Sequence, residues 1–177
     1  MTDNHNFLAL DWVKSEIEET LKQAQQALEA YIVTPSDTAK LRFCLAYLHQ
    51  VFGTLQMVEF YGAAMLAEEM EKLCLSLVNH KVSNRERAHQ ALIEAMLQLP
   101  AYLERLQVAK KDTPFVLLPV INELRMAHEE NPISELTLFK PDFVRVFSVL
   151  GQAGVSPSSD ALKKLRHGYQ LSLLGII

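Results

Sequence analysis

The sequence has little of what a β-rich or nucleic-acid-binding protein needs. Only six glycines and seven prolines occur among 177 residues, which is too few for the many tight turns of a large sheet. Lysine and arginine total 17 against 21 acidic residues, for a net charge of −4. The basic residues form no run or face of the kind that binds a phosphate backbone. Nucleic acid is therefore not an expected partner.

Segments that direct a chain to a membrane are also missing. Residues 1–6 are polar and lack the basic and apolar regions of a secretory signal. No apolar run reaches the roughly 20 residues of a membrane-spanning helix, and no basic amphipathic segment predicts binding to a membrane surface. Cys44 and Cys74 form no CxxC motif and are expected as small core residues, not as a disulfide. These absences predict a cytoplasmic protein without membrane insertion.

What the sequence does have is helical periodicity. Apolar residues recur every three or four positions, which predicts an all-α fold. We expect helices over 8–32, 37–60 and 62–78, a fourth opened by a capping box of Ser83 and Glu86, and a fifth from Thr113 to Glu129. Pro100 should kink or break the fourth helix, and Pro119 should distort the fifth. Trp12 should help to cover the apolar stripe of the first helix.

This pattern predicts an antiparallel bundle of about five helices over residues 1–130. Residues 131–157 lose the period and gain Pro, Gly and Ser, so an irregular segment is expected there. Residues 158–177 predict a further C-terminal helix that packs on the bundle or leads into more chain. Because the chain stops on an apolar run, we expect it to be a fragment of a longer protein.

Several kinds of catalytic or metal site can be set aside. The sequence contains no Gly-rich phosphate loop, dinucleotide fingerprint or HExxH motif. Glu86 and His89 have the spacing of half a di-iron site, but such bundles need that motif twice and two further carboxylates. A ferritin-like enzyme is therefore disfavoured, and no metal or cofactor is expected. The other histidines outside the second helix are expected as solvated residues, and these are His5, His80, His128 and His167.

The informative segment is 48–58, in the second helix. One row of that helix carries Arg42, Ala46, His49, Gly53 and Gln56. A glycine inside a helix costs roughly 1 kcal/mol relative to alanine, so Gly53 asks for a packing or functional reason. A bare helix surface beside a histidine would let another protein approach closely.

This segment resembles the H-x-[LIV]-K-G signature of histidine phosphotransfer domains. His49 matches the phosphorylated histidine, Gly53 matches the glycine, and Thr54 matches the small residue that follows it. On the next helix, Leu66, Ala67 and Glu71 resemble the family's L-A-x-x-x-E element. The order of five helices, with the histidine on the second, also resembles the phosphotransfer domain of chemotaxis kinases.

The resemblance implies that His49 is a phosphate acceptor. Glu71, with Glu68 as its neighbour, would hold one imidazole nitrogen as a donor and leave the other nucleophilic. Phe52 departs from the pattern, because it stands where the family has a lysine that supports the phosphoryl group. Glu68, Glu69 and Glu71 would also repel a phosphoryl dianion. The sequence thus favours a degenerate phosphotransfer domain and leaves an active one as the alternative.

Longer stretches resemble the extreme N-terminus of the hybrid kinases of type IV pilus chemotaxis-like systems (the ChpA/PilL type), and the related twitching-motility regulator FimL. They include residues 10–24, 41–44, 53–59 and 61–71. The resemblance implies signalling that controls type IV pili and twitching motility, with a histidine kinase as the parent protein. The sequence has none of the ATP-binding boxes of such kinases, so this domain alone is not expected to be an enzyme.

Two functions follow as expectations. In the first, the domain is a docking module that binds a receiver (response-regulator) protein or a pilus-pole scaffold protein through Arg42, Ala46, Phe52, Gly53 and Gln56. Phe52 would be the exposed aromatic anchor of that face, although periodicity also allows it to turn into the core. In the second, the kinase core of the parent chain phosphorylates His49, which passes the phosphate on.

Overall fold

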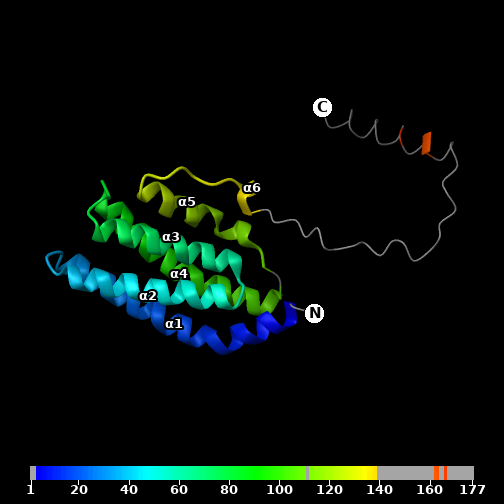
Figure 1. Ribbon diagram of the computed structural model, residues 1–177, viewed down its shortest axis with the longest axis horizontal. Coiled ribbons are helices and arrows are strands. Elements are labelled where there is room, and N and C mark those ends of the chain that lie inside the picture. Colours follow the sequence, from blue (N-terminus) through cyan, green and yellow to red (C-terminus); the bar gives the residue numbers. More distant parts are fainter. Residues whose placement is uncertain (1–2, 111, 139–161, 164–165, 167–177) are drawn as a thin grey trace. The chain divides into compact units, whose positions relative to one another are not determined.

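A computed structural model describes residues 3–110, 112–138, 162, 163 and 166, and every regular element in that part of the chain is a helix. The elements are α1 (Asp3–Val33), α2 (Thr38–Met57), α3 (Tyr61–Val78), α4 (Arg85–Ala109), the 3-10 helix η1 (Pro114–Leu117), α5 (Leu118–Ala127) and α6 (Glu135–Leu138). The expected all-α bundle is confirmed (Figure 1).

The chain divides into two compact units, Met1–Lys140 and Pro141–Ile177. In the first unit α1 packs on α2, α2 on α3, α3 on α4, and α4 back on α1, while α5 covers α3 and α4. Helices α2 and α4 are thus diagonal across a four-helix bundle (Figure 1). In the second unit Leu162, Lys163 and Arg166 are helical.

The core follows the predicted stripes. Inward positions of α1 are Leu10, Ile17, Leu21, Ala24, Leu28 and Tyr31, all at most 3% exposed. Those of α3 are Leu66, Met70, Leu73 and Leu77, all at most 1% exposed. Burying such stripes against one another is the main favourable term in bundle folding.

Some local predictions were wrong. Trp12 does not cover the stripe of α1, because it points outward and is 85% exposed. The cap of α4 is Asn84, whose side chain accepts a hydrogen bond from the Arg87 amide (3.0 Å). Ser83 donates instead to Glu129. Of the kink or break expected at Pro100, the break does not occur, because α4 runs on to Ala109.

The segment after α4 contains the predicted fifth helix, in two parts. Thr113 and Pro114 open a helical segment whose first turn is the 3-10 helix η1, and α5 follows with Pro119 in its first turn. The expected fifth helix thus begins as a 3-10 turn, and Pro119 lies where the missing N–H of a proline is tolerated. Within 131–157, α6 is described and residues 139–157 lie outside the described residues. Most of the expected helix over 158–177 also lies outside them.

Both cysteines are core residues, as expected. Cys44 of α2 and Cys74 of α3 are buried and not bonded to each other as a disulfide. The Cys74 thiol donates to the Leu41 carbonyl (3.7 Å). Its hydrogen bond with Cys44 and its burial raise the pKa of Cys74 far above the usual range, so it stays a thiol.

Candidate functional site

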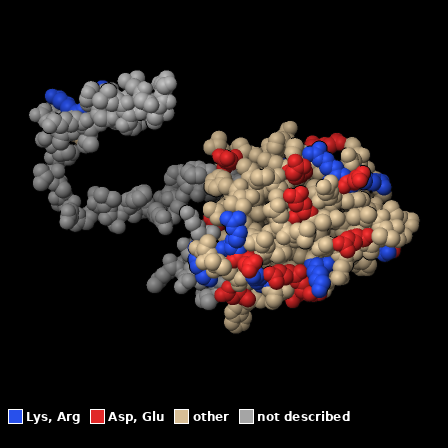
Figure 2. Space-filling model, turned by 180° about the vertical axis from the view of Figure 1, so that it is seen from behind, with Lys and Arg blue, Asp and Glu red and all other residues tan. Residues whose placement is uncertain are grey.

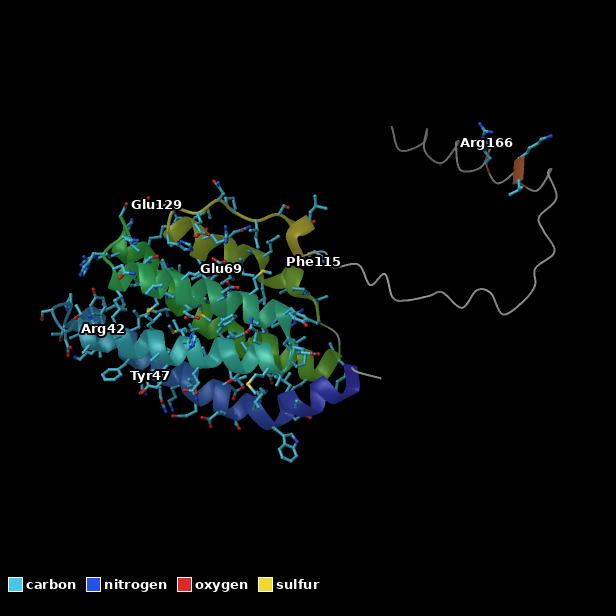
Figure 3. The ribbon with its side chains drawn as sticks, viewed as in Figure 1. Arg42, Tyr47, Glu69, Phe115, Glu129 and Arg166 are labelled. Carbon is cyan, nitrogen blue, oxygen red and sulfur yellow. The ribbon has the colours of Figure 1, made fainter. Side chains whose placement is uncertain are left out.

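The site begins with one row of α2. His49 lies in the middle of this helix, and its side chain is 71% exposed. Arg42 and Ala46 before it and Gln56 after it are also exposed. Figure 3 labels Arg42 on α2. The row faces outward because the residues that α2 turns inward are Leu41, Cys44, Leu48, Val51 and Leu55.

His49 is held from the neighbouring helix. Its Nδ1 lies 2.9 Å from Oε1 of Glu71 in α3, whose side chain is 25% exposed. A carboxylate only accepts hydrogen bonds, so Nδ1 carries the proton and Nε2 of the neutral ring keeps its lone pair. The structure thus brings together two residues 22 positions apart and leaves one imidazole nitrogen free to act as a nucleophile.

The three glutamates of α3 do not act as one acidic cluster beside His49. Glu68 pairs with Lys72 at 2.8 Å. Glu69 also pairs with Lys72, at 3.0 Å, and is 4% exposed. Partial burial lowers the pKa of Lys72, but its bonds to the two carboxylates outweigh this effect and raise it, so Lys72 is charged at neutral pH. The repulsion expected from three carboxylates is therefore reduced, because Lys72 neutralises part of it.

Phe52 and Gly53 differ in what they offer another protein. Phe52 is half-buried and packs against the hydrophobic core. It is therefore not the exposed anchor that the docking hypothesis expected, because part of its side chain is covered by the core. A Cβ built on Gly53 would meet nothing within 4 Å. The helix surface beside His49 is thus open, and Gly53 meets no packing requirement inside this domain.

Sequence reasoning missed a buried ionic cluster on the other side of α3. Glu69 pairs with Arg125 of α5 at 3.0 Å, and its Oε2 lies 3.5 Å from His128 Nε2. Arg125 also pairs with Glu130 at 2.9 Å. Figure 3 labels Glu69 on α3, below α5. The expectation that His128 is solvated was wrong, since its side chain is only 6% exposed. No local sequence signal predicts the two pairs of Glu69, because Arg125 and His128 lie 56 and 59 positions away from it.

The residues of this cluster do not favour a metal site. Ligand atoms of Glu69, His128 and Glu130 lie within 4.8 Å of one another. Arg125, however, pairs with both carboxylates and supplies the positive charge that a metal ion would otherwise bring. The cluster therefore ties α3 to the end of α5.

Two of the remaining histidines contact other side chains. His89 is not simple surface polarity, because its ring packs edge-on against Tyr31, with ring centroids 5.8 Å apart. His80 is exposed and lies 3.1 Å from an Arg85 nitrogen. His167 and the side chain of His5 lie outside the described residues.

A separate observation concerns membranes. Over the part of the chain that the structure describes, no helix is long and apolar enough to cross a membrane.

Comparison with known proteins gives one family. The model of the FimL C-terminal domain matches residues 8–123, which span α1 through most of α5. The Scaffold protein FimL of Pseudomonas aeruginosa is 30% identical over 176 residues, which cover 96% of this chain and 31% of that protein. The chain thus spans about a third of its relative's length. No solved structure matches. The chain belongs to the FimL C-terminal domain family.

Proposed function

We propose that this domain is a docking module of a scaffold, and that partners bind to the face of α2 around His49 and Gly53. The observation that carries the proposal is the open surface at Gly53, where an added Cβ would meet nothing within 4 Å. A glycine that costs helix stability without serving internal packing is explained by the close approach of another protein. The relative from Pseudomonas aeruginosa is itself named a scaffold protein.

The partner we propose is a receiver protein, with a pilus-pole scaffold protein as the alternative. Both follow from the resemblance to phosphotransfer domains of type IV pilus signalling, so the module would act in the cytoplasm in the control of twitching motility. In this proposal the domain itself catalyses no reaction, since docking requires only a complementary shape and charge.

The docking proposal is tested at Gly53. Gly53→Arg should abolish binding of the cognate receiver in calorimetric titration, because the long side chain covers the open helix surface. Gly53→Ala should weaken binding less than Gly53→Arg does, because a methyl group keeps the partner only slightly farther from the helix. His80→Gln, at an exposed residue outside α2, is the control and should bind as the parent chain does. If Gly53→Arg binds the receiver as well as the parent chain does, the α2 face is not the docking surface.

A second function is favoured by one contact, the bond of His49 Nδ1 to Glu71. It leaves Nε2 able to attack a phosphoryl group. The N–P bond would form as the bond from phosphorus to the donor's leaving group breaks, and the proton on Nδ1 would stay hydrogen-bonded to Glu71. In this alternative the domain is an active relay, phosphorylated by the kinase core of a parent protein. Phe52 supplies no charge to support that step.

Phosphoramidate separates the two functions without any partner protein, because it donates phosphate to accessible imidazoles and releases ammonia. An active acceptor would show an acid-labile phosphohistidine signal in phosphorus NMR that His49→Gln removes and His80→Gln leaves. Glu71→Gln should slow the labelling but not prevent receiver binding. If His49 stays unlabelled while the receiver binds, docking alone remains.

A further inference from the structure

The outer face of α4 carries apolar side chains that the bundle does not cover. Leu97 is 60% exposed, and the neighbouring Ile32 at the end of α1 is 38% exposed. Ile93 lies between them and is half-buried. Together with four polar residues of α4 they line a groove of about 430 Å³ between α1 and α4. The groove has an apolar floor and a polar border.

The polar border of this groove is acidic. Glu86 and Glu94 lie on it, eight residues apart on α4. Eight residues of helix rise about 12 Å, so the two carboxylates stand roughly two turns apart. Among the described residues, neither has an ion-pair partner. A second groove, of about 250 Å³, continues on the α5 side and shares Glu94.

No positive charge in the wall of the first groove compensates these carboxylates. His89 is its one titratable base. Burial, and then the charge of Arg85, lower the pKa of His89, so the ring is neutral at pH 7. Nearby, Arg87 is engaged with Glu123 at 3.1 Å. The view from behind in Figure 2 shows a face that is mostly uncharged, with both acidic and basic side chains scattered around it.

We infer that this α4 face is a second docking surface, and that its occupant is a basic amphipathic helix of another protein. Leucine-type side chains of such a helix would cover Leu97 and Ile93, while lysines or arginines two turns apart would pair with Glu86 and Glu94. This is the way an amphipathic helix lies in a groove, with its charges complementary to the border. The inference rests on the scaffold function proposed above, since a scaffold needs more than one binding surface.

The position of the face supports this use. Helices α2 and α4 are diagonal in the bundle, so the face around Gly53 and the face around Leu97 point in different directions. A partner on one would not cover the other. The domain could therefore hold two proteins at once.

A pair of synthetic 18-residue peptides tests the inference on the full 177-residue chain. Both carry leucines on one helical face, and their polar face carries lysines in one peptide and glutamates in the other. The lysine peptide should bind in fluorescence anisotropy, and the glutamate peptide should not. Binding should weaken as salt rises, because the carboxylates are exposed.

Variants locate the binding site. Leu97→Ser should weaken the lysine peptide about tenfold, and Glu86→Gln with Glu94→Gln roughly three- to tenfold. Phe43→Ser on α2, which also removes a large exposed side chain, is the matched control and should change nothing. Circular dichroism checks that each variant folds.

Three outcomes would overturn the inference. Equal binding of both peptides would show a non-specific apolar surface. Binding that Gly53→Arg abolishes and Leu97→Ser leaves intact would place the peptide on the α2 face. Self-association of the chain that Leu97→Ser removes would make the α4 face an interface between copies. Receiver binding at Gly53 is measured separately by titration, so a failure of this inference can be told apart from a failure of the proposed function.

Discussion

Two helical glycines have opposite surroundings, and this decides what alanine would do at each. At Gly53 a Cβ meets nothing within 4 Å, whereas at Gly62 it would lie 2.7 Å from Pro114 Cβ. Gly53→Ala should therefore raise the free energy of unfolding by about 0.5–1 kcal/mol through helix propensity alone. Gly62→Ala should lower it, because η1 must move away from α3. Urea unfolding measures both, and a stabilised Gly62→Ala chain would contradict the close contact with Pro114.

His89 gives a prediction about pH at the same scale. Its pKa is lowered in the folded chain by burial and then by Arg85, from a usual value of 6.5. Below pH 6.5 the unfolded chain therefore binds a proton at this site more readily than the folded chain, so stability falls as pH drops. Between pH 7 and 5, His89→Gln should lose less stability than the parent chain. Parallel slopes for the two proteins would show that His89 titrates normally.

At the scale of elements, the Glu69 cluster fixes α5 on α3. Arg125→Met leaves a nearly buried carboxylate with only Lys72 and His128, and should cost about 2–4 kcal/mol. Arg87→Met removes a comparable but half-exposed pair between α4 and α5 and should cost less than about 1 kcal/mol. Thermal unfolding of the two variants compares them directly. Equal losses would mean that burial adds nothing to the Glu69 pair.

The same elements show how far the sequence predicts the structure. The stripe of α3 from Leu66 to Leu77 was predictable, because periodicity depends only on neighbours along the chain. The burial of Glu69 was not, since its partner Arg125 is 56 residues away and no local pattern joins them. The predicted burial of Trp12 was wrong for a related reason. An aromatic side chain beside an apolar stripe is buried only if a neighbouring helix reaches it, and periodicity does not show whether one does. The contact of His49 with Glu71 was anticipated from the family motif, which encodes the α2–α3 pairing that periodicity leaves open.

At the scale of the whole molecule, the diagonal placement of α2 and α4 predicts independent binding at two faces. The receiver and the lysine peptide should form a complex with one copy of each per chain, measurable by sedimentation velocity. Gly53→Arg should remove only the receiver, and Leu97→Ser should weaken only the peptide, because the two residues lie on helices that face apart. The two faces share no binding residue, so each affinity should change less than about twofold when the other site is filled. A larger change would mean that the bundle transmits binding from one face to the other.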